Sequence, residues 1–95
     1  MREGVISYYL TRNDYEVDFV LGSAEEEGVS EMLQVCADLS DPATRARELR
    51  ALQEAMGELD CGSATLITLY ADETVQTPAG AIRVVPAWQW FLRLV

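Results

Sequence analysis

Alternation between apolar and polar residues dominates the first forty residues of the chain, and it predicts β-strands rather than helices. Turn-forming residues at 11–14 and an acidic, glycine-flanked stretch at 22–30 separate the alternating segments and predict loops. The pattern therefore predicts three consecutive strands joined by short connections, at residues 5–10, 15–21 and 31–37.

The second strand carries the clearest alternation. Because successive side chains of a strand point to opposite faces, one face is expected to hold four apolar residues, namely Tyr15, Val17, Phe19 and Leu21. The opposite face is expected to hold Glu16, Asp18 and Val20. In the third strand the same rule places Gln34 and Cys36 on one face.

Helical periodicity replaces alternation after residue 40. Pro42 directly after Ser40 and Asp41 is typical of a helix start, because proline lacks the N–H that the first turn leaves unpaired. Gly62 predicts the end of this helix. Apolar residues recur three and four positions apart between these limits and predict one buried stripe, formed by Leu49, Leu52, Ala55, Met56 and Leu59.

The last third of the chain predicts strands and a short helix. The apolar run 64–70 is typical of a central strand buried on both faces, and Pro78-Ala79-Gly80 predicts a hairpin turn between strands at 74–77 and 81–85. Pro86 opens a terminal helix. Three of its apolar residues share one face, namely Trp88, Phe91 and Leu92, and Trp88 at least is expected in the core. The alternative is a docking patch of Trp88 and Trp90, of which Trp90 is the better candidate for contact with another domain.

The order β-β-β-α-β-(ββ)-α predicts a single α/β (α+β) domain over residues 1–95, with a small mixed sheet and flanking helices. The net charge of −9 argues against tight binding of DNA or RNA by the chain, and it favours either a basic protein partner or no role beyond solubility. No apolar run is long enough to cross a bilayer, so a cytoplasmic location is expected. Cys36 and Cys61 lack metal-site spacing and are expected as free thiols.

Two carboxylates on the second strand are the first candidates for chemistry. Glu16 and Asp18 are two residues apart, and antiparallel pairing with the third strand brings Gln34 and Cys36 to the same side. Oxygen atoms of this kind bind Mg²⁺, but a thiol does not, and the chain has no lysine or histidine. Three interpretations stay open: the solvent face of a hairpin, an inert polar cluster, and a metal site.

Several segments together resemble a known family. They are Tyr8-Tyr9, Arg12, residues 16–20 (EVDFV), residues 33–45 (LQVCADLSDPATR), residues 66–69 (LITL) and residues 84–88 (VVPAW). These segments resemble the C-terminal domain, of unknown function, of a group of prokaryotic AAA+-type ATPases. That domain is similar to the PD-(D/E)XK restriction-endonuclease-like fold. The resemblance covers the chain from about Ser7 to Leu92.

The resemblance implies a role for each position of the nuclease motif. Asp18 matches its first metal-binding aspartate, Gln34 stands where its second acid belongs, and Cys36 stands where its lysine belongs. The resemblance therefore implies a degenerate site in which Asp18, Gln34 and Cys36 are vestiges and no residue is catalytic. No cofactor is expected, although Mg²⁺ held by Asp18 and Glu16 belongs to the variant-site interpretation.

The resemblance also implies a missing ATPase part, because a phosphate-binding GxxxxGK[ST] loop requires a lysine. A piece of a longer ATPase is expected, since the first strand starts close to Met1. The expected function is a non-catalytic accessory or interaction module of an AAA+-type ATP-binding protein. Its expected partners are the ATPase domain, on the same polypeptide or another, or a second copy. The alternatives are a metal-dependent nuclease with a variant PD-(D/E)XK site and a non-catalytic nucleic-acid-binding module.

Overall fold

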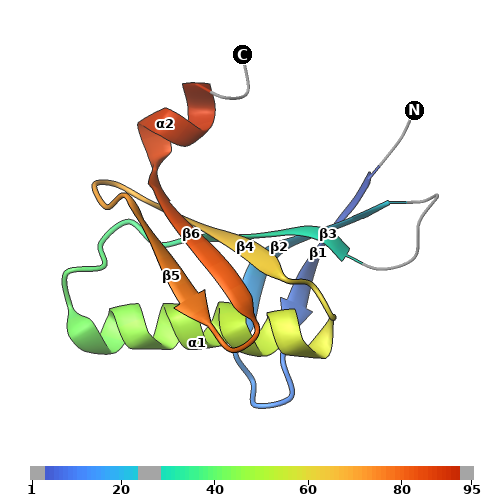
Figure 1. Ribbon diagram of the computed structural model, residues 1–95. Helices are drawn as coiled ribbons and strands as arrows, with labels where there is room; N and C mark the ends of the chain where they lie inside the picture. The colour runs from blue at the N-terminus through green and yellow to red at the C-terminus, as the bar shows by residue number, and fades with distance from the viewer. Residues whose placement is uncertain (1–3, 24–28, 93–95) are drawn as a thin grey trace.

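A computed structural model describes residues 4–23 and 29–92, and the secondary structure follows the predicted order (Figure 1). The predicted α/β class, with a small mixed sheet and two helices, is confirmed. The elements are β1 (Gly4–Leu10), β2 (Glu16–Ser23), β3 (Val29–Val35), α1 (Pro42–Glu58), β4 (Ser63–Thr68), β5 (Glu73–Thr77), β6 (Gly80–Pro86) and α2 (Ala87–Leu92). The acidic residues Glu25-Glu26-Glu27 lie outside the described residues.

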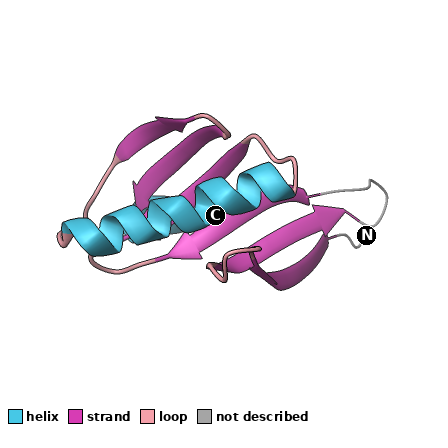
Figure 2. Cartoon of the chain, turned by 90° about the horizontal axis from the view of Figure 1, so that it is seen from below, coloured by secondary structure: helices cyan, strands magenta, loops and turns pink. Residues whose placement is uncertain are grey.

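The strands form one six-stranded sheet in the order β1-β2-β3-β4-β6-β5. The first three strands are antiparallel, β3, β4 and β6 are parallel, and β5 is antiparallel to β6 at the other edge. Adjacent parallel strands need a crossover connection, which α1 provides between β3 and β4. Figure 2 shows α1 lying across one face of the sheet.

The core lies between α1 and that face of the sheet. The predicted helical stripe is confirmed, because Leu52, Ala55 and Met56 are buried and Leu49 and Leu59 pack partly buried beside them. These side chains meet buried residues of four strands, namely Val17, Met32, Ala64, Leu66, Ile82 and Val84. Among the described residues no helix is long and apolar enough to cross a membrane.

The start of α1 follows the prediction, whereas its end does not. Asp41 is the N-cap, and its carboxylate accepts hydrogen bonds from Thr44 N at 3.2 Å and from Thr44 Oγ1 at 2.9 Å. The helix ends at Glu58, before Gly62, because Asp60 takes the left-handed conformation with φ 54°. A short polar side chain makes this conformation accessible to aspartate, so the expected stop at Gly62 is wrong by two residues.

The terminal helix differs from the expectation. The side chains of Trp88 and Phe91 are each 63% exposed, and no residue of α2 is buried. Trp90 is half-buried, so the expected division between a core Trp88 and an outward Trp90 is wrong. The reason is that α2 leaves the end of β6 and points away from the sheet instead of folding back across it (Figure 1).

Candidate functional site

An irregular pairing of β2 sets the direction of Asp18. Ser7 of β1 lies opposite Val20, but Tyr9 lies opposite Val17, so β2 holds one more residue than β1 in this stretch. Such a bulge changes which face a side chain points to. Val17 is buried in the core under α1, and Asp18 lines a cavity together with Ala51 of α1, so both lie on the helix side. The strict alternation predicted for residues 15–21 is therefore wrong at this point.

Gln34 links β2, β3 and α1 from a buried position. Its side chain is only 5% exposed. The Oε1 atom of Gln34 accepts a hydrogen bond from the backbone N–H of Asp18 at 2.8 Å. Its Nε2 atom donates to Oε1 of Glu48 at 2.7 Å. One amide thus satisfies a backbone donor of the neighbouring strand and a carboxylate of the helix, which an acid at this position cannot do while ionised.

Asp18 completes this network with its carboxylate. The Oδ2 atom accepts a hydrogen bond from the backbone N–H of Val35 at 3.1 Å, just where β3 ends. The expected proximity of Asp18 and Gln34 is therefore confirmed. Both line a cavity of about 290 Å³ whose other residues include Arg47 and Glu48 of α1. The side chain of Glu16, the other predicted metal ligand, lies outside the described residues.

Cys36 follows the end of β3 and is half-buried. Its Sγ lies 3.6 Å from the carbonyl oxygen of Asp38, to which the thiol donates. Burial raises the pKa of this thiol, and the nearby carboxylate of Glu48 adds to the effect. The thiol is therefore protonated at neutral pH and supplies neither a positive charge nor a nucleophile. Cys36 and Cys61 are both free thiols, as predicted.

Glu48 is the residue that the strand pattern did not reveal. It stands three and four positions before the buried residues Ala51 and Leu52, so helical spacing puts it at the border of the buried stripe. That spacing was a usable signal. Arg47, which also lines the cavity, brings a cation to the site from α1 rather than from the position of Cys36.

The chemistry available at this site is limited. The carboxylates of Asp18 and Glu48 are the groups that a divalent cation would bind, with the Gln34 oxygen as a third ligand only if its bond to Asp18 N is shared or broken. Among the side chains that the structure describes, which exclude that of Glu16, no group of three or more acidic, cysteine or histidine residues is arranged to hold a metal ion. The geometry is that of a structural hydrogen-bond network beside a small polar cavity.

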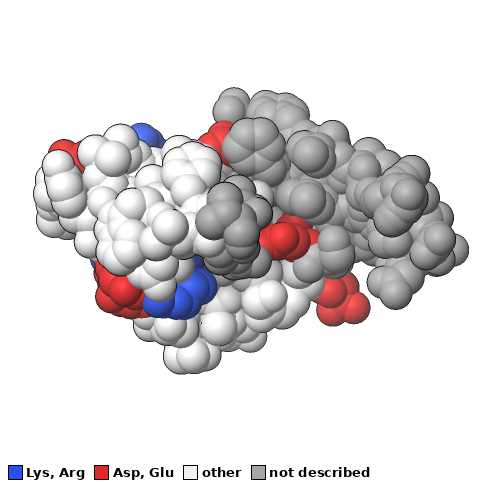
Figure 3. Space-filling view, turned by 90° about the horizontal axis from the view of Figure 1, so that it is seen from above, with Lys and Arg blue, Asp and Glu red and all other residues white. Residues whose placement is uncertain are grey.

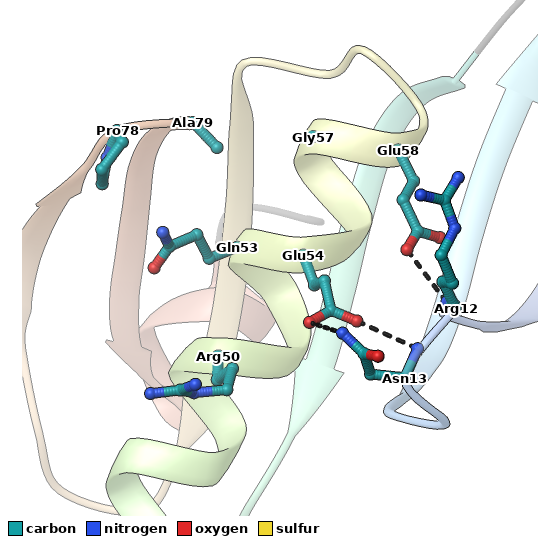
Figure 4. A pocket seen from close by; sticks show the side chains of 9 residues that line it. All are labelled: Arg12, Asn13, Arg50, Gln53, Glu54, Gly57, Glu58, Pro78 and Ala79. Carbon is teal, nitrogen blue, oxygen red and sulfur yellow. Dashed lines mark hydrogen bonds between the residues drawn. The ribbon is translucent and has the colours of Figure 1, made fainter.

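A larger cavity lies elsewhere, as an open groove of about 900 Å³ between α1, the β1–β2 turn and the β5–β6 turn (Figure 4). Two carboxylates of α1 line it. Glu58 accepts hydrogen bonds from the hydroxyl of Tyr9 at 2.7 Å and from Arg12 N at 2.9 Å. Glu54 accepts two from Asn13, at 3.3 Å from its backbone N and 3.0 Å from its Nδ2. These bonds hold the β1–β2 turn on α1, so the groove is a structural junction.

Comparison with known proteins gives one informative similarity. The chain is similar to the uncharacterized protein MJ1544 of Methanocaldococcus jannaschii, with 33% identity over 91 residues. The similarity covers 90% of this chain but 20% of the relative, so the chain spans about a fifth of that protein's length. No family model matches the chain, and no solved structure matches it.

Proposed function

We propose that this chain is a non-catalytic accessory domain of a cytoplasmic AAA+-type ATP-binding protein, and that it acts by contacting another protein domain. The sequence resemblance supports the AAA+ assignment and the descent from a PD-(D/E)XK nuclease-like fold. The similarity to a much longer archaeal protein supports the accessory role, since most of that relative lies outside the matched part.

The bonding of Gln34 carries the non-catalytic assignment. Hydrolysis by a metal-dependent nuclease needs carboxylates that can bind the metal ion. It also needs a positively charged side chain that stabilises the developing negative charge. Here the second acid is replaced by a buried amide that is bonded to Asp18 N and to Glu48. The thiol of Cys36 supplies no charge in place of the lysine. The two hydrogen bonds of Gln34 join β2, β3 and α1.

A metal titration tests this proposal. The chain is titrated with Mg²⁺ and Mn²⁺ in a calorimeter, and its thermal unfolding is followed with and without each ion. We expect no binding heat and an unchanged unfolding temperature, because a bound ion would stabilise the folded state. Binding that disappears in Asp18→Asn, together with metal-dependent cleavage of a plasmid or of a single-stranded oligonucleotide, would contradict the proposal.

One observation favours the alternative of a variant nuclease. Asp18, Glu48 and Arg47 line the same cavity, so two carboxylates and a cation are within one site despite the changes at Gln34 and Cys36. Under this alternative, cleavage is lost in Asp18→Asn and in Glu48→Gln. The nucleic-acid-binding alternative predicts retention on DNA at low salt that falls steeply as salt is added, which the net charge of −9 opposes.

A further inference from the structure

An exposed group of large apolar side chains surrounds the end of the sheet from which α2 emerges. We call it the α2 surface, and it consists of Leu69, Tyr70, Trp88, Phe91 and Leu92, which are 48%, 87%, 63%, 63% and 61% exposed. Figure 3, which looks down on this end of the molecule, shows mostly uncharged described residues with charged side chains around them. Aromatic residues exposed together in this way are unusual on a surface that meets only water.

The strand pairing and the helix bring these residues to the same end of the sheet. In the parallel pair β4 and β6, Thr68 lies opposite Pro86, so the residues that follow each of them emerge side by side. Leu69 and Tyr70 follow the first, and α2 follows the second. Within α2, Trp88, Phe91 and Leu92 stand at positions i, i+3 and i+4, which share one helical face.

The size of the α2 surface is that of an interface core. An aromatic side chain buries roughly 150–250 Å² when fully covered, so the three partly exposed rings leave roughly 400 Å² of apolar area, before the two leucines are added. The largest apolar patch of an ordinary monomer is about 300–600 Å² and is often functional. A standard interface buries about 800 Å² on each partner, with its apolar part in the centre. The α2 surface fits that central part.

The helix is also only partly covered by its own domain. With six residues and no buried side chain, α2 is too short to be stable in isolation. Its main neighbours among the described elements are β4 and β6. Parallel strands are normally covered on both faces, yet α1 covers one face of this sheet (Figure 2). A covering partner would supply both the second layer and further contacts for α2.

Charge and length identify the kind of partner. Two copies of this chain would bring two net charges of −9 together, which opposes a homodimer and favours a basic partner. The relative in M. jannaschii has four-fifths of its length outside the matched part, so a domain of this type occurs there joined to other protein. We infer that the α2 surface docks a folded, basic domain of a longer protein to which a domain of this type is joined. This inference rests on the function proposed above.

The probe is the M. jannaschii protein from which the 91 matching residues have been removed. Fluorescently labelled chain is titrated with this remainder, and the matching M. jannaschii segment serves as the reference ligand. We expect saturable binding that weakens as salt is added. The double variant Trp88→Ser/Phe91→Ser and the single variant Tyr70→Ser are each expected to weaken binding at least tenfold, with far-UV circular dichroism showing that each remains folded.

The matched control is Leu10→Ser. Leu10 is also a large apolar residue and is 47% exposed, but it precedes the β1–β2 turn, which lies at the opposite end of the molecule from α2 (Figure 1). This variant is expected to bind like the unaltered chain. Binding that Trp88→Ser/Phe91→Ser leaves unchanged overturns the inference. Failure of the chain to bind, whether or not the M. jannaschii segment binds, overturns it too.

Two further measurements complete the test. Sedimentation equilibrium is expected to give a monomer, and a dimer that Trp88→Ser/Phe91→Ser dissociates makes a second copy the occupant and overturns the inference. If the deletion unfolds the remainder, hydrogen exchange of α2 is measured in a chimera in which this chain replaces the 91 matching residues. Exchange at least tenfold slower than in the isolated chain supports docking, and equal exchange overturns it. Neither a dimer nor equal exchange contradicts the non-catalytic assignment, which only metal-dependent cleavage would contradict.

Discussion

Replacing Gln34 by glutamate tests the proposed structural role of Gln34, because it introduces the acid that the PD-(D/E)XK motif has at the position that Gln34 is proposed to match. The new side chain has the same shape, so it keeps an acceptor for the N–H of Asp18, which lies 2.8 Å from Oε1 of Gln34. The change affects Nε2, which in Gln34 donates to Oε1 of Glu48 at 2.7 Å. In the variant a carboxylate oxygen takes the place of Nε2, so the carboxylates of residues 34 and 48 face each other.

The magnitude follows from this contact. A hydrogen bond to a charged group is lost, which contributes about 1.5–3 kcal/mol. Two negative charges about 4 Å apart repel by about 4 kcal/mol at the effective dielectric constant of a protein surface. Glu48 is half-buried and can turn toward water, which relieves part of the repulsion. We expect Gln34→Glu to reduce the free energy of unfolding by about 2–4 kcal/mol at pH 7.

The pH dependence has a defined sign. Repulsion raises the pKa of the carboxyl pair in the folded state, so the folded state binds a proton more readily than the unfolded chain. The deficit is therefore largest at pH 7 and shrinks as the pH falls through the raised pKa, where one shared proton restores a hydrogen bond. A carboxyl group whose pKa is raised in the folded state destabilises that state above the raised pKa. A salt-bridged acid, whose pKa is lowered, stabilises the folded state there instead.

Urea unfolding followed by circular dichroism at pH 7 and pH 5 measures these quantities. The double variant Gln34→Glu/Glu48→Gln reverses the donor and acceptor across the contact, and we expect it to regain all but about 1 kcal/mol of the loss. Gln76→Glu adds the same charge at an exposed position of β5 and is expected to change stability by less than about 0.5 kcal/mol. If Gln34→Glu is as stable as the unaltered chain at pH 7, or if the double variant fails to recover, the network is not what holds these elements together.

Three other predictions use contacts away from this site. Gly57→Ala is expected to stabilise the chain by about 0.5–1 kcal/mol, because Gly57 lies in α1 with nothing within 4 Å of the added methyl group. Gly80→Ala is expected to lower the urea concentration at which the chain unfolds. Gly80 has a φ of 140°, and an added Cβ would lie 2.0 Å from the backbone oxygen of Gly62. The side-chain amide of Asn13 in the β1–β2 turn lowers the pKa of Glu54. The stabilisation of the folded state by Glu54 is therefore present above the ordinary carboxyl pKa and is lost as the pH falls. Glu54→Gln should show a shallower fall of Tm between roughly pH 5 and pH 3. The hydrogen bond to Glu58 raises the pKa of Tyr9, so an ultraviolet titration of Glu58→Ala should show one tyrosine ionising at lower pH, and an unchanged curve would rule the bond out.

The order and type of the elements followed from local patterns, because periodicity and capping act between residues that are near in sequence. The buried stripe around Leu52 and the N-cap at Asp41 are of this kind. The direction of Asp18 is different. It depends on an extra residue in the pairing of β2 with β1, which alternation within one strand does not encode.

The sequence by itself determined the α/β class, the nearness of Asp18 to Gln34 on neighbouring strands, and the absence of lysine from the chain. Only the tertiary structure decided that Glu48 of α1 meets Gln34 and that Trp88 and Phe91 of α2 stay exposed. The physical reason is the same in both cases. Contacts between elements depend on how the sheet carries α1 across one face and sends α2 beyond its end, and these distances are set by packing between residues far apart in the chain.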